Sequence, residues 1–154
     1  MFAQEPKGYM TKAVYDQLIQ ICREAAPSEA CGIAASSFAY PDQSETNGII
    51  HFPIIDTIIP ITNTHINPSH AFSFDPIEWT AAYFEMQKNR QSLVGLFHSH
   101  PTTPAIPSSS DTEGFLPASE LSYWIVSLED AEAPQVMPYR RVQGAFVPMQ
   151  LVLA

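Results

Sequence analysis

The sequence predicts a mixed α/β fold in which helices pack against a mixed β-sheet. The order of its segments is the first reason, because helical and apolar strand patterns follow one another as helix, strands, helix, strands. Size is the second reason, because 154 residues with 45% apolar side chains can bury a core in one ordinary domain. We therefore expect a single domain over residues 1–154.

The first helix is expected in the segment TKAVYDQLIQICREAA. The polar residues of the segment fall mostly on one side, and the apolar residues at helical spacing are Val14, Leu18, Cys22 and Ala25, with Ile21 beside them. Pro27 should end this helix, because proline lacks a backbone N–H and its ring clashes with the preceding turn.

The second helix is expected from about residue 76 to about residue 89. Asp75 is a good N-cap, Pro76 suits the first helical position, and Glu78 closes a capping pattern. The apolar face of this helix is expected to be formed by Ile77, Ala81 and Phe84 and to be widened by Trp79, Tyr83 and Met86.

The remaining apolar segments predict strands, and a closing hairpin should turn at Gln143–Gly144. The expected strands lie in CGIAASSF, IIHFPIIDTIIPIT, FSF, SLVGLFH, LSYWIVSL and VMPYRRVQGAFVPMQLVLA. SLVGLFH is apolar nearly throughout and should lie at the centre of the sheet. Pro53 and Pro60 cannot donate ladder hydrogen bonds, so the isoleucine-rich strands should lie at an edge or bend. YPDQSETNG is expected to be a polar turn.

Charge and composition narrow the function classes. The formal net charge of −9 disfavours nucleic acid and anionic membrane surfaces as partners. No apolar run approaches the ~20 residues of a membrane helix, and the N-terminal segment MFAQEPKGYM does not resemble a signal peptide. Cys22 and Cys31 suggest no disulfide framework, so a cytoplasmic location with reduced thiols is expected.

The segment GLFHSHPTTPAIPSSSD, residues 95–111, suggests a metal site. His98 and His100 are two residues apart at the end of an expected strand, so both imidazoles should point to the same face. Both could then reach one zinc ion at ~2.0–2.1 Å, and Asp111 could return through the loop as a third ligand. Three protein ligands would leave one position for water, as catalytic zinc sites do.

A structural interpretation of the same segment remains open. An isolated pair of histidines is weak support for a metal, and the run from Ser110 to Glu113 also fits a helix cap. Ser110 would then cap the helix while Glu113 reaches back, and Asp111 would favour the helix dipole. The spacing excludes the zincin pattern and the zinc deaminase pattern, since neither H-E-x-x-H nor P-C-x-x-C occurs.

The longer pattern HSHPTTPAIPSSSD resembles the JAMM motif of the MPN+ metallopeptidases, which reads H-[ST]-H-P, six residues, S, two residues, D. PSEACGI, residues 27–33, is similar to the glutamate-bearing segment of the small prokaryotic members. One departure is Ser36 or Ser37, where many relatives carry a glycine, and it concerns packing. The resemblance implies the MPN (cytidine-deaminase-like) architecture, a curved mixed β-sheet flanked by helices.

The resemblance also implies a role for each matching residue. His98, His100 and Asp111 would hold Zn²⁺. Glu29 would be the general base that accepts a proton from the attacking water and delivers it to the leaving amine. Ser108 would donate a hydrogen bond to the tetrahedral oxyanion.

The implied activity is hydrolysis of an amide bond at the C-terminal tail of a ubiquitin-like protein, of the sulfur-carrier type. Such extended tails could add to a sheet edge formed by residues 49–62. A deubiquitinase-like isopeptidase of broader specificity is one alternative. A catalytically silent MPN scaffold is another, although such scaffolds typically lack motif residues that this chain keeps. A third alternative is a zinc hydrolase of small-molecule amides, which would share the site. The sequence does not indicate an oligomeric state.

Three further residues are candidates for a role in the site. Cys31 is expected to be a small buried apolar residue, although its closeness to Glu29 leaves room for metal contact or redox sensitivity. His65 and His70 are expected in a loop, with substrate contact as the alternative.

Overall fold

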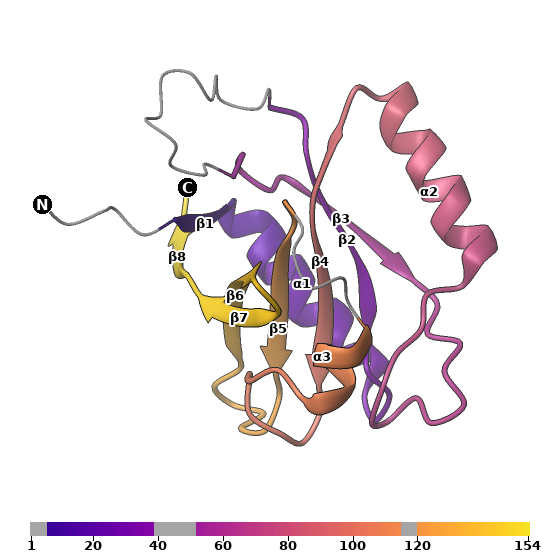
Figure 1. Ribbon diagram of the computed structural model, residues 1–154, viewed down its shortest axis with the longest axis vertical. Coiled ribbons are helices and arrows are strands. Elements are labelled where there is room, and N and C mark those ends of the chain that lie inside the picture. Colours follow the sequence, from indigo (N-terminus) through magenta and orange to yellow (C-terminus); the bar gives the residue numbers. More distant parts are fainter. Residues whose placement is uncertain (1–5, 39–51, 115–119) are drawn as a thin grey trace, which may run out of the picture.

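A computed structural model describes residues 6–38, 52–114 and 120–154, apart from the side chains of residues 112–114 (Figure 1). The helices are α1 (Lys12–Ala25), α2 (Pro76–Lys88) and α3 (Ser109–Gly114). The strands are β1 (Lys7–Met10), β2 (Cys31–Ser36), β3 (Thr57–Ile61), β4 (Ser92–His100), β5 (Ser122–Ser127), β6 (Gln135–Val142), β7 (Ala145–Pro148) and β8 (Gln150–Leu153).

The main sheet of the described residues has six strands in the order β3-β2-β4-β5-β6-β7. β4 and β5 are parallel, and the other neighbouring pairs are antiparallel, so the predicted mixed sheet is confirmed. The central place of β4 and the edge place of β3, which contains Pro60, are confirmed as well. β1 and β8 form a separate parallel pair that the sequence pattern did not predict.

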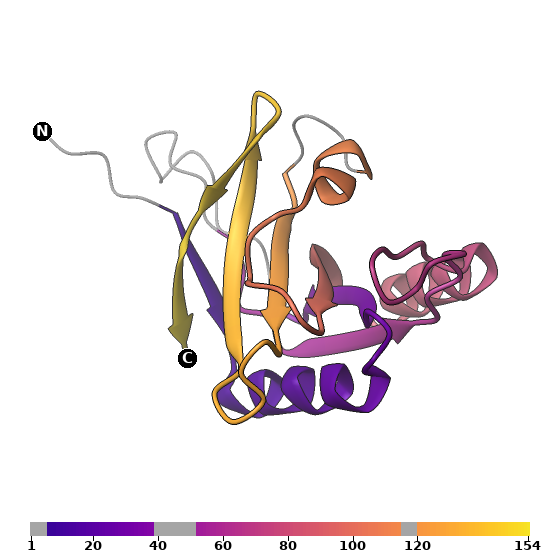
Figure 2. The ribbon, with the colours of Figure 1, turned by 90° about the horizontal axis from the view of Figure 1, so that it is seen from below.

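α1 packs on one face of the main sheet, as the apolar pattern of its sequence predicts (Figure 2). The buried residues of the helix are Val14, Leu18 and Cys22. They share a core cluster with Phe97 of β4 and Trp124 of β5. Burial of one such leucine typically stabilises a fold by about 1.5–3 kcal/mol, so this face holds the helix on the sheet. The helix ends at Ala25, shortly before Pro27.

α2 begins and ends nearly as predicted. The predicted centre of its apolar face was wrong, and burial of Met86, at the predicted margin of that face, is confirmed. The buried residues are Ala82 and Met86, whereas Ile77 is 81% exposed and Phe84 is 63% exposed. Apolar residues lie on several sides of this helix, so periodicity alone could not select the side that meets the sheet. The small side chain of Ala82 allows close contact with the sheet. No described helix is long and apolar enough to cross a membrane.

The capping of α2 also differs in part from the prediction. Asp75 is the N-cap, and its side chain accepts hydrogen bonds from the N–H groups of Ile77 and Glu78. Glu78 does not reach back to Asp75, because its Oε1 accepts from the N–H of Thr62 at 3.1 Å. The backbone N–H of Asp75 donates instead to the Thr62 carbonyl at 3.1 Å. These contacts fasten the start of α2 to the end of β3.

The strand predictions have mixed outcomes. The hairpin of β6 and β7 turns at Gln143 and Gly144, where both φ angles are positive (49° and 85°), as a type I′ turn requires. The strand predicted for FSF is absent, because Phe74 forms only an isolated bridge with Asn63. The isoleucine-rich run contributes β3 alone among its described residues, and Ile55 makes an isolated bridge with Met10. The polar turn predicted for residues 40–48 lies outside the described residues.

Gly32 allows the strands around the start of β2 to pack closely. A Cβ at this position would lie 2.3 Å from the Ile59 carbonyl oxygen of β3 and 2.5 Å from the ring of Phe97. Any larger residue would therefore push β3 or β4 away from β2. β2 begins two residues after Glu29, so this packing holds that residue close to the end of β4.

Candidate metal centre

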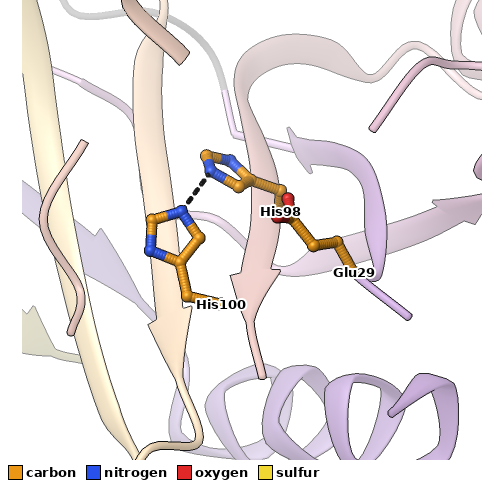
Figure 3. Close-up of side chains that lie close together, drawn as sticks. All are labelled: Glu29, His98 and His100. Carbon is orange, nitrogen blue, oxygen red and sulfur yellow. Dashed lines mark hydrogen bonds between the residues drawn. The ribbon is translucent and has the colours of Figure 1, made fainter. Parts of the chain in front are cut away.

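The two histidines lie at the carboxyl end of β4, on the same face of the sheet. Their Nε2 atoms are 3.1 Å apart, and both side chains are buried (Figure 3). Ser99, between them, points to the opposite face, where its Oγ accepts a hydrogen bond from the N–H of Ala30 at 2.8 Å. The alternation of a β-strand thus brings two imidazoles together, as the spacing predicts.

A backbone carbonyl fixes the proton of one imidazole. His100 Nδ1 lies 2.8 Å from the carbonyl oxygen of Pro104, which can only accept a hydrogen bond. Nδ1 must therefore carry the proton, and the lone pair of a neutral His100 is on Nε2. That lone pair faces His98 and Asp111. Orientation of a ligand histidine through its second nitrogen is a common feature of metal sites.

The loop after β4 is held at three successive residues. Ser127 Oγ donates to the Thr103 carbonyl at 2.6 Å, His100 holds Pro104, and Tyr139 donates its hydroxyl to the Ala105 carbonyl at 2.5 Å. The loop is thereby tied to the end of β5 and to the middle of β6 before it returns to β4. This path brings α3, which carries Asp111 in its first turn, back to the histidines.

Ser108 caps α3, and the predicted cap at Ser110 was wrong. Asp111 donates its backbone N–H to Ser108 Oγ at 3.1 Å, and Ser108 donates its own N–H to Asp111 Oδ2 at 2.8 Å. α3 begins at Ser109, so Ser110 already lies inside the helix. The side chain of Glu113, predicted to reach back to the cap, lies outside the described residues. The paired hydrogen bonds fix the direction of the Asp111 carboxylate.

Asp111 completes a buried group of three donor side chains. Its Oδ1 lies 3.0 Å from His98 Nε2, and its Oδ2 lies 3.2 Å from His100 Nε2. Burial raises the pKa of Asp111, but hydrogen bonds from the protonated form of His100 and from His98 outweigh burial and hold the pKa of this carboxyl well below its usual range. Burial lowers the pKa of His98, and hydrogen bonding to Asp111 and Pro104 raises the pKa of His100 against the effect of burial.

These donor atoms fit a divalent metal ion. Ligands placed ~2.0–2.1 Å from a tetrahedral zinc ion stand roughly 3.3–3.4 Å from one another, and the separations here are 3.0–3.2 Å. Imidazole nitrogen and carboxylate oxygen are ordinary zinc ligands. A cation between them would offset the negative charge that Asp111 carries into a buried position.

Glu29 lies beside this group because β2 runs antiparallel to β4. Cys31 pairs with His98 in that register, so the residues preceding β2 reach the end of β4. Glu29 is 6% exposed, and ligand-type atoms of Glu29, His98 and His100 all lie within 4.8 Å of one another (Figure 3). Burial raises the pKa of Glu29 to about 7, the charge of His100 lowers it, and that of Asp111 raises it.

One oxygen of Glu29 is a buried acceptor that the described residues do not satisfy. Its Oε1 has no hydrogen-bond partner there. Buried polar atoms in proteins are nearly always hydrogen-bonded, so such an atom calls for a donor from beyond the described residues. A water molecule or a substrate N–H beside the metal ligands would supply that donor.

The three further candidates lie outside this group. Cys31 is buried and donates its thiol to the Ile61 carbonyl at 3.3 Å, and burial together with the charges of Glu29 and Glu78 raises its pKa to about 12. It therefore behaves as a buried small residue, as expected. His65 accepts at Nδ1 from the N–H of Asn67 within the loop between β3 and α2, and the exposed His70 lies in the same loop.

Comparison with known families gives a match over residues 11–142 to the family described as prokaryotic homologs of the JAB domain. The chain belongs to this family. The resemblance to small prokaryotic MPN+ proteins, seen first in the histidine motif, is thereby confirmed. The matched residues include Glu29, both histidines, Ser108 and Asp111.

Curated relatives carry peptidase names. A probable TtuB-protein conjugate cleaving protease of Thermus thermophilus is 35% identical over 57 residues, which are 37% of this chain and 38% of that protein. A desampylase of Haloferax volcanii is 28% identical, over 64% of this chain and 65% of the relative. A CysO-cysteine peptidase of Mycobacterium tuberculosis is 27% identical, over 83% of this chain and 78% of the relative. The matches thus span less than two thirds of the first two relatives.

Solved structures share the fold over nearly the whole chain. A protein from Desulfitobacterium hafniense has a TM-score of 0.78 at 30% identity, covering 95% of this chain and 92% of that one. A JAB1/MPN domain protein from Archaeoglobus fulgidus has a TM-score of 0.53 at 17% identity, covering 95% and 98%. The second likeness concerns the fold alone, and it confirms the predicted MPN architecture.

Replacement of His98 tests the candidate metal centre directly. His98→Ala should weaken zinc binding by more than about 100-fold, because even loss of an outer partner of a metal ligand costs 10–100-fold. Affinity would be measured by competition with a chromophoric chelator, and His70→Ala is the matched control because His70 is exposed in a loop. If the folded His98→Ala protein bound one zinc ion as tightly as the wild type, His98 would not be a ligand.

Proposed function

We propose that this protein is a metal-dependent peptidase that hydrolyses an amide bond at the C-terminal tail of a ubiquitin-like protein of the sulfur-carrier type. The observation that carries the proposal is the buried group of two imidazoles and a carboxylate, placed beside a second carboxylate with an unsatisfied oxygen. The names of the relatives support the substrate class, since they refer to a TtuB conjugate, to desampylation and to CysO.

His98, His100 and Asp111 are proposed to hold the ion, and zinc is the metal their donor atoms favour. When bound, such an ion polarises a carbonyl and lowers the pKa of a water to about 7. Ser108 and Pro104 keep the ligands in place, Ser108 through Asp111 and Pro104 through His100. The chain therefore fixes the donor atoms before an ion arrives.

Glu29 is proposed to move the proton of the reaction. A carboxylate oxygen of Glu29 lies within 4.8 Å of the ligand-type nitrogens of both histidines, and this carboxylate can accept a proton from the attacking water. Transfer of that proton to the departing nitrogen would let the amine leave as a neutral product. Burial eases the first of these steps, because it favours the protonated carboxyl over the carboxylate.

Ser108 is proposed to donate a hydrogen bond to the oxyanion, as the family resemblance implies. Its Oγ accepts from the N–H of Asp111, and a hydroxyl that accepts one hydrogen bond can also donate one. The same side chain would then hold a metal ligand and stabilise the negative charge that develops on the substrate.

The substrate tail is proposed to lie along β3, the edge strand of the sheet. A groove of about 560 Å³ lies between β3 and α2, and a smaller pocket of about 240 Å³ reaches Glu29. Pro60 and Ile61 line both, so the two hollows adjoin at the end of β3. An extended tail added to an exposed edge would follow this path toward the metal ligands.

The central experiment is cleavage of ubiquitin-like fusion proteins by the zinc-loaded wild type and by Glu29→Gln. The variant should retain its zinc and lose roughly 10²–10⁴-fold in turnover, the usual contribution of a positioned base. Glu24→Gln, on the exposed side of α1, is the matched control. Undiminished turnover by Glu29→Gln would remove the proposed base, and a wild type that binds zinc but cleaves no fusion would argue for a silent scaffold.

Ser108→Ala tests the oxyanion contact. We expect kcat to fall by roughly 10²–10³-fold with little change in KM, because the contact forms only in the transition state. Bound zinc would be measured in the same samples, since Ser108 also contacts Asp111. A change in KM alone would reassign Ser108 to substrate binding, and loss of zinc would make its role purely structural.

Ile59→Ala tests the proposed path of the tail. Ile59 lines the groove between β3 and α2, so the variant should raise KM for a tail peptide several-fold and leave kcat nearly unchanged. Phe84→Ala is the control, because Phe84 is exposed on α2 and does not line the groove. Equal KM values for the wild type and Ile59→Ala would place the tail elsewhere.

A further inference from the structure

The segment between β3 and α2, residues 62–75, contacts the metal centre at two points. Its ends are tied together, because Thr64 donates its N–H to the Ser73 carbonyl at 2.9 Å and Asp75 donates to the Thr62 carbonyl at 3.1 Å. Figure 1 shows it as the irregular stretch that joins β3 to α2. A loop closed in this way behaves as one unit and can hold neighbouring groups in place.

Asn63 is the centre of the segment. Its Oδ1 accepts from the N–H groups of His65 at 3.0 Å and Ser73 at 3.1 Å, which can only donate. Its Nδ2 faces three carbonyl oxygens, which can only accept: those of Glu29 at 3.0 Å, Ala71 at 3.0 Å and Pro68 at 3.3 Å. The chemistry of these partners therefore fixes the orientation of the amide.

This amide and its loop hold the backbone of Glu29 from two directions. The carbonyl of Glu29 accepts from Asn63 Nδ2, and the N–H of Glu29 donates to the Pro68 carbonyl at 2.7 Å. Pro68 is held in turn by Asn63. The position of the proposed base thus depends on one side chain that lies more than thirty positions away in the sequence.

The other end of the segment covers a metal ligand. Phe72 stacks on the imidazole of His98, with ring centroids 4.6 Å apart and an interplanar angle of 27°. Phe72 also packs edge-on against Phe74 at 5.3 Å, and Phe74 packs against Trp79 of α2 at 5.1 Å. A row of aromatic rings therefore connects His98 to the second helix.

We propose that residues 62–75 are a positioning element of the metal centre, in which Asn63 fixes Glu29 and Phe72 fixes the ring plane of His98. The two contacts set the distance between Glu29, which precedes β2, and the histidines at the end of β4. Misplacement of a reacting group by about 1 Å can cost on the order of 100-fold in rate. The kinetic part of this inference rests on the proposed function, and the remaining measurements need no substrate.

Asn63→Asp is the most selective variant. It keeps the size of the side chain and both acceptor bonds within the loop, but it places an oxygen against three carbonyl groups. Asn67→Asp is the matched control, because it adds the same charge to the same loop at an exposed side chain. Bound zinc and thermal unfolding would be measured for both, and Asn63→Ala replaces the aspartate variant if that variant does not fold.

Three results are expected for Asn63→Asp. Turnover of the fusion substrate should fall roughly 10- to 100-fold with KM nearly unchanged. The amide proton of Glu29 should exchange with solvent at least about tenfold faster, while the amides of β5 keep their protection. The protein should still bind one zinc ion. Asn67→Asp should match the wild type in each measurement.

Phe72→Leu tests the second contact through metal affinity. It should weaken zinc binding roughly 10- to 100-fold, as loss of an outer partner of a ligand does, whereas Phe84→Leu on the exposed side of α2 should not.

The positioning role would be overturned by wild-type Glu29 exchange and turnover in Asn63→Asp, by equal losses in Asn67→Asp, or by unchanged zinc affinity in Phe72→Leu. A wild type that cleaves no fusion protein would overturn the proposed function, and amide exchange and zinc affinity would still decide the positioning role.

Discussion

The buried negative charge of Asp111 is the constraint on which the site depends. A carboxylate at this depth is costly unless positive charge or strong hydrogen-bond donors compensate it. The structure surrounds it with two imidazole nitrogens at 3.0 and 3.2 Å and with the N–H of Ser108 at 2.8 Å. Neutral imidazoles alone compensate it only in part, so the arrangement favours a cation between the three side chains.

The fold supplies this geometry through the ends of its central strands. β4 and β5 are parallel, so their carboxyl ends lie side by side. β2 begins at the same end of the sheet because it is antiparallel to β4. This end of the strands therefore brings together the histidines, Glu29 and the loop that returns Asp111. Hydrogen bonds from Ser127 and Tyr139 to the returning loop tie its path to the two neighbouring strands.

Much of this could be predicted from the sequence where a local rule applies. The limits of α1 and α2, the central place of β4 and the turn at Gln143–Gly144 follow from proline, capping, apolar patterning and glycine. The meeting of His98 and His100 follows from the period of a strand. The role of Glu29 as the base is implied by the family resemblance alone, because nothing in its neighbouring sequence distinguishes it from other acidic residues.

The sequence predictions failed where tertiary contacts determine which residues are buried or hydrogen-bonded. Apolar residues around α2 gave no single face, and only the sheet selects Ala82 and Met86 over Ile77 and Phe84. Three consecutive serines before Asp111 offered three possible caps, and the path of the loop selects Ser108. Asn63 and Phe72 have no spacing signal, because Glu29 and His98, the site residues they contact, are distant in the sequence.

Ser99 shows how tightly the two sides of the sheet are linked. Its hydroxyl oxygen accepts a hydrogen bond from the backbone N–H of Ala30, and its own N–H donates to the Ala30 carbonyl at 3.0 Å. The residue between the two imidazoles thus anchors the chain one position after the proposed base. A purely aliphatic residue at position 99 would leave the buried N–H of Ala30 unsatisfied, at a cost of about 1–3 kcal/mol. The residue between the two histidines is therefore constrained by contacts on the face of the sheet opposite to the candidate metal centre.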